Sequence, residues 1–437
     1  MNTRRLAALV LLSLAPSCGG SSSPTAPGQT TSQCSTSGPV TFVRDTLQNI
    51  YYWYKDLPNP DPASFASPEA YLEAVRYRPL DSSFSYITSK ASSDAFYSES
   101  QYIGFGLSYK RTGDLELRVT QTFPGSSAAE AGLDRGDSLL SIGGKTVAEL
   151  LQTGEINTIF GPEQIGFTVS VSWRNLQGRE RSATLTKRLV TIPTVSQTTV
   201  VDAGALRVGY VHLRNFVTPS VAALDTAFTQ LREAGATDLV LDLRYNGGGL
   251  ISVAQHLGGL IGGPPLAGQV FLQFVHNDKN TSRNSALRLE SLPAALGAPR
   301  LVVIATRASA SASEGVVNSL RPYMDVKVVG DTTYGKPVGQ YGFDFCDKVL
   351  YPVSFLVTNA RGEADYFGGI PADCAAADDL DRPLADAREA SFAEALHVLR
   401  RGGCSGTATA QAEAQARLRA RAGELPRDGW RQLVNAW

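Results

Sequence analysis

A run of small residues contains the first side chains that could carry out chemistry. Ser309, Ser311 and Ser313 alternate with alanines between an apolar strand at 301–304 and a segment whose apolar residues recur at helical spacing. The run is therefore expected to be a turn from a strand into a helix, where unpaired backbone N–H groups point outward. A serine hydroxyl at this turn would have N–H donors nearby for a developing oxyanion.

A serine becomes a nucleophile only with a base beside it, and the downstream segment Thr333–Gln340 offers Lys336 for this role. Upstream, an apolar strand expected at 238–244 leads into three consecutive glycines, residues 247–249, and then into a helical pattern over 250–261. This second strand, turn and helix would again expose backbone N–H groups.

The three stretches resemble, in order and spacing, the motifs of the carboxy-terminal processing peptidases, which are Ser-Lys proteases. Those motifs read roughly D-L-R-x-N-x-G-G, S-A-S-A-S-E and T-F-G-K-G-x-x-Q, and this chain has DLRYNGGG, SASASE and TYGKPVGQ. The resemblance implies that Ser311 is the nucleophile, that Lys336, 25 positions later, is the base, and that Gln340 assists it. It also implies a serine endopeptidase with an α/β layered, crotonase-like core and no cofactor or metal.

A lysine accepts the serine proton only when it is neutral, whereas its unperturbed pKa is about 10.4. Burial is therefore expected to lower the pKa of Lys336, and the uncharged amide of Gln340 could orient the amine without opposing that effect. The oxyanion is expected to be held by the N–H of Ala312 and that of Gly248 or Gly249.

Two residues of the lysine motif depart from the family pattern. Tyr334 replaces a phenylalanine and keeps its ring, whereas Pro337 replaces a glycine, removes one N–H and stiffens the segment. Pro337 and Gly339 also favour an extended conformation there. Asp242 and Arg244, at the end of the strand before the glycines, are interpreted as a positioning pair.

Other classes of function fit the sequence less well. A Ser-His-Asp hydrolase would need one of the chain's four histidines, but no G-x-S-x-G motif is present; the histidines are His212, His256, His276 and His397. The glycine run matches neither G-x-G-x-x-G nor a phosphate-binding loop. The alternative kept open is a non-catalytic ligand- or peptide-binding lipoprotein on the same fold, against which the retained Ser311, Lys336 and Gln340 argue.

Length and composition indicate a multidomain α+β protein. The 437 residues are 43% hydrophobic and 19% charged, which is ordinary for globular domains with real cores. The formal net charge of -1 gives no reason to expect nucleic acid or an anionic membrane surface as a partner. Protein or peptide substrates with a free C-terminus are the partners that the resemblance implies.

The N-terminus has the pattern of an export signal. Arg4 and Arg5 precede an apolar run at 6–15, so residues 1–17 are expected to be a signal peptide. Cys18 and the Ser-, Thr-, Gly- and Pro-rich segment 18–39 resemble the start of a bacterial lipoprotein, with Cys18 lipidated and a flexible tether behind it. The expected location is then the cell envelope, facing the periplasm or exterior; a plain cleaved signal with a free Cys18 is the alternative.

Four further segments follow the tether. A helical N-terminal domain is expected over 40–100, an α/β protease domain over 189–404 and a C-terminal tail without an assigned role over 405–437. The segment 101–188 has strand patterns at 102–109, 115–120, 167–173 and 181–186, and resembles a protease-type PDZ domain. In that resemblance, the peptide-binding positions are Ile103, Gly104, Phe105, Gly106 and Leu107.

The remaining cysteines number four, an even count that suggests two disulfides in an exported chain. Three pairings are possible. Cys346 with Cys374 and Cys34 with Cys404 are favoured, because the second would tie the start of the folded region to its end. Unpaired buried thiols are the alternative, and the absence of CxxC pairs argues against a zinc site.

Overall fold

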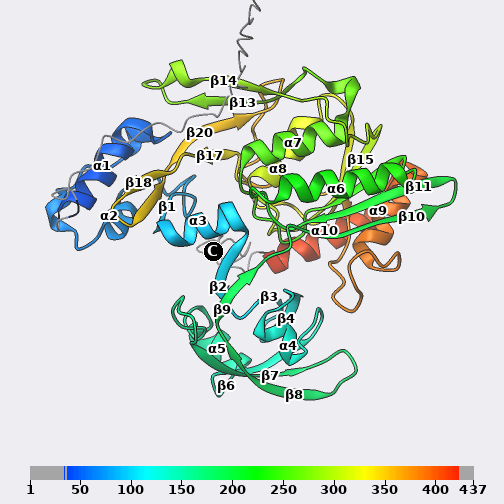
Figure 1. Ribbon diagram of the computed structural model, residues 1–437, viewed down its shortest axis with the longest axis horizontal. Coiled ribbons are helices and arrows are strands. Elements are labelled where there is room, and N and C mark those ends of the chain that lie inside the picture. Colours follow the sequence, from blue (N-terminus) through cyan, green and yellow to red (C-terminus); the bar gives the residue numbers. More distant parts are fainter. Residues whose placement is uncertain (1–33, 35–36, 423–437) are drawn as a thin grey trace, which may run out of the picture.

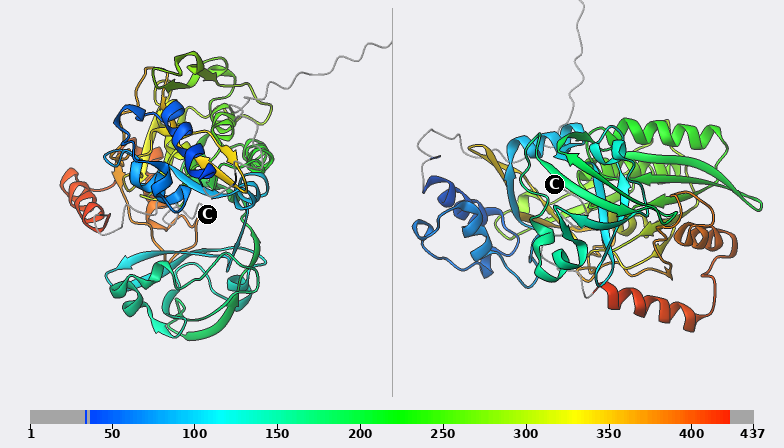
Figure 2. Two further views of the ribbon diagram at one scale, coloured as in Figure 1. Left: turned by 90° about the vertical axis from the view of Figure 1, so that its left-hand side faces the viewer. Right: turned by 90° about the horizontal axis from the view of Figure 1, so that it is seen from below.

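A computed structural model of the protein describes residue 34 and residues 37–422. Figures 1 and 2 show a larger body, in which helices cover sheets, and a smaller strand-rich part at one side of it. The expected signal segment 1–17, Cys18 and residues 423–437 lie outside the described residues. Among the described helices, none is both long and apolar enough to cross a membrane.

The N-terminal part is helical, as the sequence predicts. Its elements are α1 (Gly38–Ile50), η2 (Tyr54–Asp56), η3 (Pro62–Ser64), α2 (Pro68–Val75), β1 (Tyr86–Ser89) and α3 (Lys90–Glu99). Ser67 caps α2 by accepting a hydrogen bond from the Ala70 N–H at 3.1 Å, and Pro68 occupies the first turn. Tyr51, in the aromatic run after α1, is fully buried and belongs to the core.

This N-terminal core is shared with strands that come almost 300 residues later. Val43 and Tyr51 pack in one cluster with Phe343 and Leu350, and β1 pairs antiparallel with β19 (Lys348–Tyr351). The helical part is therefore built onto the later chain rather than folded around a core of its own.

Residues 101–188 form the β-rich unit. Its elements are β2 (Gln101–Gly104), β3 (Leu107–Gly113), β4 (Glu116–Thr122), α4 (Ser127–Ala131), β5 (Ser138–Ile142), β6 (Lys145–Thr146), α5 (Val147–Thr153), η4 (Glu155–Asn157), β7 (Thr168–Arg174) and β8 (Glu180–Thr186). The main sheet has the order β3-β4-β5-β7-β8, and β6 pairs with β5. β2 instead pairs antiparallel with β9 (Arg188–Thr191), the strand by which the chain leaves the unit.

The single strand expected over 102–109 is two strands. It breaks at Gly106, whose φ of 82° lies in the left-handed region, and a Cβ there would sit 1.9 Å from the Ser126 Cβ. The alternating pattern could not reveal this turn, since both halves alternate. The strands expected at 115–120, 167–173 and 181–186 are confirmed as β4, β7 and β8.

A six-stranded sheet is the centre of the larger body. Its order is β10-β11-β12-β15-β16-β21. The strands are β10 (Val195–Ala203), β11 (Leu206–Leu213), β12 (Asp238–Asp242), β15 (Arg300–Ala305), β16 (Asp325–Gly330) and β21 (Cys374–Ala375). From β11 onward all neighbours are parallel, and both faces are covered, which explains the continuous apolar runs in the sequence.

Helices cover both faces of this sheet (Figure 1). They are α6 (Ser220–Glu233), α7 (Ile251–Gly262), α8 (Ala312–Leu320) and α9 (Ala390–Arg401). Leu241 of β12 points into the cluster with α6, α7 and α8, whereas its neighbour Val240 packs with Phe392 of α9. Since β12 and β15 are parallel neighbours, the turns after them lie at one edge of the sheet.

Two smaller sheets complete the larger body. Four strands have the order β14-β13-β20-β17, and β1, β19 and β18 form a three-stranded sheet. The bounds not yet given are η5 (Pro264–Leu266), β13 (Val270–His276), η6 (Thr281–Arg283), β14 (Ser285–Arg288), β17 (Val338–Gln340), β18 (Phe343–Phe345), β20 (Val353–Thr358) and α10 (Ala408–Ala422). The extended conformation expected after Lys336 is confirmed as β17.

The four cysteines form two disulfides, but the favoured pairing is wrong. Cys34 pairs with Cys346 and Cys374 with Cys404, with Cα–Cα distances of 5.8 and 5.3 Å. Cys374 lies on β21, and Cys404 follows α9, which packs on the same sheet. Cys34 precedes α1, where Phe42 stacks on Phe345 at 5.1 Å and brings the chain to Cys346.

Candidate active site

The serine-rich turn joins β15 to α8, as expected. Two of its serines are buried and donate to main-chain carbonyls of the neighbouring loop: Ser309 Oγ to Leu243 at 2.7 Å and Ser313 Oγ to Asn246 at 2.8 Å. These hydroxyls hold the turn. Ser311 between them has φ 57° and ψ -115°, a rare conformation for a residue other than glycine. Such strain persists where the surroundings fix the backbone, and it is common at catalytic turns.

The glycine run passes directly against this turn. A Cβ on Gly248 would lie 2.8 Å from the Ala310 oxygen, the Ala312 nitrogen and the Ser311 Cβ, so only glycine fits there. The Gly248 N–H donates to the Asn246 side-chain oxygen at 2.9 Å. Gly249 has φ 139° and packs against the Phe216 carbonyl.

Lys336 is buried, with 3% of its surface exposed, immediately before β17. Its Nζ donates to the Gln340 Oε1 at 2.6 Å. The Gln340 Nε2 donates in turn to the carbonyls of Phe84, at 2.6 Å, and Tyr351, at 2.8 Å. The Phe84 ring lies under the lysine nitrogen, with Nζ 5.6 Å from the ring centre.

A buried carboxylate joins the serine turn to the lysine segment. Glu314 Oε2 accepts from the Ser311 N–H at 2.9 Å and the Lys336 N–H at 2.8 Å. Its Oε1 accepts from the Gly335 N–H at 2.7 Å and from the Thr333 hydroxyl. Burial raises the pKa of Glu314, while these four donors oppose that shift. With a donor on each lone-pair direction, the side chain acts as an acceptor only.

Sequence reasoning quoted Glu314 as part of its motif but gave it no role. The signal was present, since a glutamate three residues after a serine at a helix start is a capping-box pattern. The contact of Phe84 with Gln340 was not predicted. No local sequence pattern indicates that a backbone carbonyl from the N-terminal part would accept a hydrogen bond from that glutamine.

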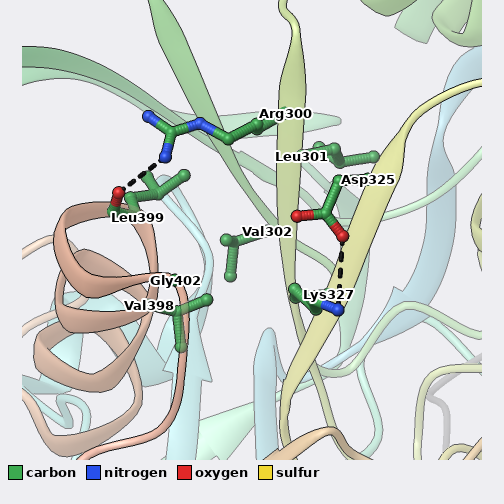
Figure 3. Close-up of a pocket in the computed structure, with 8 residues that line it drawn as sticks. All are labelled: Arg300, Leu301, Val302, Asp325, Lys327, Val398, Leu399 and Gly402. Atoms are coloured by element: carbon green, nitrogen blue, oxygen red, sulfur yellow. Dashed lines mark hydrogen bonds and ion pairs between the residues drawn. The ribbon is translucent and has the colours of Figure 1, made fainter.

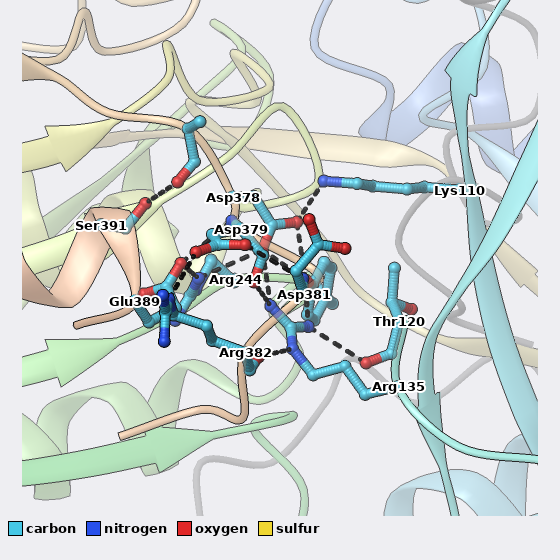
Figure 4. Close-up of polar contacts among 12 residues, drawn as sticks. Lys110, Thr120, Arg135, Arg244, Asp378, Asp379, Asp381, Arg382, Glu389 and Ser391 are labelled. Atoms are coloured by element: carbon cyan, nitrogen blue, oxygen red, sulfur yellow. Dashed lines mark hydrogen bonds and ion pairs between the residues drawn. The ribbon is translucent and has the colours of Figure 1, made fainter. Parts of the chain in front are cut away.

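Asp242 and Arg244, predicted to be a positioning pair, form a fully buried ion pair, with Nη2 of the arginine 2.6 Å from Oδ2 of the aspartate. The arginine also reaches Glu389 at 2.8 Å and Asp378 at 3.1 Å. Figure 4 shows Arg244 and Arg135, which comes from the β-rich unit, converging on Asp378. Although burial alone would raise it, Lys110 and the two arginines hold the pKa of Asp378 well below its usual range.

The same network reaches the glycine run. Arg135 Nη1 donates to the Tyr245 hydroxyl at 2.7 Å, and that hydroxyl donates to Asp378 at 2.6 Å. Tyr245 has φ 63° and directly precedes Asn246 and the glycines. The charges of Arg135, Arg244 and Asp378 therefore fix the backbone from which the glycine turn starts.

Three of the four histidines are engaged away from the serine turn. His212 is buried between Ser196 and the Arg244 carbonyl, and burial lowers its pKa to about 4. His256 contacts Asp225 at 2.7 Å, and His276 contacts Asn284 and Tyr341. His397 lies on α9. These contacts provide no base for Ser311.

A small pocket lies at the opposite end of the central sheet (Figure 3). It includes Arg300 and Asp325, which begin β15 and β16, and the end of α9. Its polar groups are already paired, Asp325 with Lys327 at 3.3 Å and Arg300 with the Leu399 carbonyl at 2.8 Å. It contributes nothing to the serine turn.

The expected peptide-binding positions are divided among three elements. Ile103 and Gly104 end β2 and are paired with β9, Phe105 and Gly106 form the turn, and Leu107 begins β3. The Phe105 carbonyl accepts from the Ala128 N–H at 3.0 Å. β3 is the edge strand of its sheet.

Two segments of the chain match models of one peptidase family. Residues 207–373 match Peptidase family S41, and residues 40–86 match the Peptidase S41 N-terminal domain. The chain is 29% identical over 261 residues to the chloroplastic C-terminal processing peptidase of Tetradesmus obliquus, covering 56% of this chain and 53% of that protein. It is 27% identical over 232 residues to the carboxyl-terminal-processing protease of Synechocystis sp., covering 53% and 52%.

The chain thus spans about half the length of the curated relatives that it matches. A solved structure assigned to the S41 proteases, from Bacteroides fragilis, is similar in fold, with a TM-score of 0.65 at 23% identity over 82% of this chain and 97% of that one. Both segments and the named relatives point to one family: residues 40–86 and 207–373 of this chain are an S41 N-terminal domain and an S41 peptidase domain, and the named relatives are peptidases of the carboxyl-terminal processing type.

Proposed function

We propose that this protein is an endopeptidase in which Ser311 is the nucleophile and Lys336 is the general base. The observation that carries the proposal is the Glu314 carboxylate, which accepts the backbone N–H groups of both residues and so holds their segments together. The strained Ser311 backbone and the burial of Lys336 support the same roles.

The lysine has to be neutral to act as a base. Its side chain is almost fully buried, and its Nζ faces the neutral amide of Gln340 and the Phe84 ring. Burial disfavours the charged ammonium form of the lysine. A neutral amide stabilises that charged form less than a carboxylate would. The Glu314 carboxylate accepts from the backbone N–H of Lys336.

The reaction would proceed in two steps. In the first, Ser311 Oγ bonds to the substrate carbonyl carbon while its proton passes to neutral Lys336; the C–N bond then breaks, and the ammonium returns the proton to the leaving amine. In the second, a water molecule gives a proton to Lys336 and attacks the ester, and Ser311 Oγ leaves with that proton. The enzyme ends as it began.

The oxyanion in both steps would be held by backbone N–H groups of Ala312 and the Gly248–Gly249 segment. Since the Gly248 N–H already donates to Asn246, Gly249 and Ala312 are the stronger pair of donors. The close approach of Gly248 to the Ser311 turn supports this arrangement.

Substrate recognition is assigned to the β-rich unit, residues 101–188, as a PDZ domain. Its edge strand β3 can accept an extended peptide by strand addition, and the turn at Phe105–Gly106 would hold a terminal carboxylate. The substrates would be exported proteins with a free, apolar C-terminus.

Lipidation at Cys18 would keep the enzyme at a bacterial envelope membrane, facing the periplasm or exterior. Incorporation of labelled fatty acid that is lost in Cys18→Ala tests this point. Equal labelling of both proteins would remove the anchor from the proposal.

The catalytic roles are tested with an unfolded protein such as casein and a fluorophosphonate label. Wild type should cleave casein and take up the label, whereas Ser311→Ala should do neither while keeping its melting temperature. Lys336→Ala and Lys336→Arg should both be inactive, because a guanidinium cannot be deprotonated near neutral pH. Cleavage by Ser311→Ala, or full activity in Lys336→Arg, would refute the assignment.

A further inference from the structure

The segment between α2 and β1 reaches the lysine through Gln340. Both carbonyls that accept from the Gln340 Nε2 are main-chain groups: Phe84 from the N-terminal part, at 2.6 Å, and Tyr351 from β19, at 2.8 Å. With two acceptors on the amide nitrogen, the amide oxygen has to face Lys336. The direction of the Gln340 amide is therefore set partly by the N-terminal part.

The direction of this amide matters for a lysine base. An amide oxygen takes an N–H of the neutral amine and leaves the amine lone pair for the serine proton. A reversed amide would instead donate its own N–H to that lone pair and block it. The two orientations of an isolated glutamine amide differ little in energy, so the neighbours decide which one is populated.

The Phe84 carbonyl is held in place by a buried polar cluster next to it. Asp81 Oδ1 accepts from the Ser85 N–H at 2.9 Å, and Oδ2 accepts from the Ser85 hydroxyl at 2.5 Å and the Tyr51 hydroxyl at 2.8 Å. The Ser85 hydroxyl accepts from the Val353 N–H of β20 at 2.9 Å. Asp81, Ser85 and Tyr51 are all fully buried.

We propose that Asp81 is a positioning residue for catalysis, which orients Gln340 and through it Lys336 by fixing the backbone at Phe84 and Ser85. The N-terminal part thereby completes the active site instead of only packing beside it. This inference rests on the proposed role of Lys336 as the base. Asp81 is three contacts from Nζ and touches no reacting atom, so its effect is on placement.

The experiment compares Asp81→Asn and Ser85→Ala with Val43→Ala. An asparagine keeps one acceptor oxygen for three donors, and Ser85→Ala removes the hydroxyl that links Asp81 to β20. Val43 is equally buried in the same N-terminal core but takes no part in the polar cluster, so its truncation reports destabilisation alone. Melting temperature, kcat and KM for a peptide, and the rate of fluorophosphonate labelling are measured for each purified, folded protein.

We expect Asp81→Asn and Ser85→Ala to lower kcat and the labelling rate by about tenfold or more, the equivalent of about 1.4 kcal/mol, with KM changed less than about twofold. Val43→Ala should lower the melting temperature while its kcat stays near wild type. If Asp81→Asn does not fold, Ser85→Ala decides.

Wild-type kcat in Asp81→Asn and Ser85→Ala, with Lys336→Ala inactive, would overturn this inference and leave the proposed function standing. A kcat loss in Val43→Ala as large as that in Ser85→Ala would also overturn it, because the effect would then be a general loss of structure. Retained activity in Lys336→Ala would overturn the proposed function itself, and the inference with it.

Discussion

Replacing Glu314 by glutamine tests whether its carboxylate holds the Ser311 and Lys336 segments together. The carboxylate accepts four donors, two on each oxygen, from Ser311, Lys336, Gly335 and Thr333. A glutamine of the same shape puts an NH₂ group where one of these oxygens stood. If the NH₂ group replaces Oε1, the Thr333 hydroxyl can rotate and accept a hydrogen bond from it. The Gly335 N–H, however, loses its acceptor.

The size of the effect follows from that lost partner. A buried donor left unpaired costs about 1–3 kcal/mol. If the whole amount fell on the transition state, kcat/KM would decrease by roughly 5- to 150-fold, since about 1.4 kcal/mol is one factor of ten. The reversed amide would leave the Ser311 and Lys336 N–H groups unpaired, which costs more, so the first orientation sets the lower bound.

Stability should change with pH in a defined direction. Burial raises the pKa of Glu314, so the folded protein binds this proton more tightly than the unfolded chain, whose value is about 4.3. The stabilisation that comes from protonated Glu314 is fully present below the pKa of the unfolded chain. It is lost as pH rises through the pKa of the folded protein. Glutamine cannot titrate, so the destabilisation of Glu314→Gln relative to wild type should be larger at low pH than at neutral pH.

The assay is urea unfolding of both proteins between pH 4 and 8, with kcat/KM measured at pH 8. Glu233→Gln, at the exposed end of α6, is the matched control and should change neither quantity. Wild-type kcat/KM in Glu314→Gln would refute the role given to this carboxylate. A destabilisation that increases with pH would refute the raised pKa of Glu314 in the folded protein.

Three further predictions follow from other parts of the molecule. Amidation of a substrate C-terminus should lower cleavage efficiency by roughly 10- to 100-fold, the loss of one charge-assisted hydrogen bond, and deletion of residues 101–188 should abolish the difference; equal cleavage of acid and amide by the intact protein would remove the PDZ assignment. The pKa of Asp378 is depressed when folded, so its stabilisation is present above the unfolded value of about 3.9 and is lost as pH falls; the urea midpoint should drop on acidification, and less steeply in Asp378→Asn. Non-reducing peptide mapping should recover Cys374 linked to Cys404, and replacing both by serine should lower the free energy of unfolding by about 3–4 kcal/mol, the entropy of a loop of this length; recovery of Cys346 linked to Cys374 would contradict the fold.

The elements that carry the catalytic candidates were predictable because their signals are local. Ser311 follows a readable strand and begins a readable helix, and the family motifs fixed its spacing to Lys336 and Gln340. The central sheet was also predictable, since strands such as β12 and β15 are buried on both faces and form unbroken apolar runs. The start of helix α2 was predictable from its cap residue, Ser67, and from Pro68 in its first turn.

The features that sequence reasoning missed are those set by distant contacts. A disulfide pairing depends on which segments meet in space, and Cys404 meets Cys374 only because α9 folds back onto the sheet that ends in β21. The hydrogen bond from Gln340 to the Phe84 carbonyl has no sequence signal, because every residue type carries a backbone carbonyl. The break at Gly106 was hidden because a turn between two alternating segments preserves the alternation.

The disulfide between Cys34 and Cys346 determines which elements would bear a pulling force applied to the N-terminal end of the chain. A pull on the chain ahead of Cys34 is transmitted through a covalent bond to the turn between β18 and β19, 312 residues away in sequence, and not only to the first turn of α1. Strand β19 carries Tyr351, whose carbonyl accepts from Gln340. Tension on the N-terminus is therefore shared between the helical part and the sheet beside the lysine, and reduction of this bond would redirect all of it into α1.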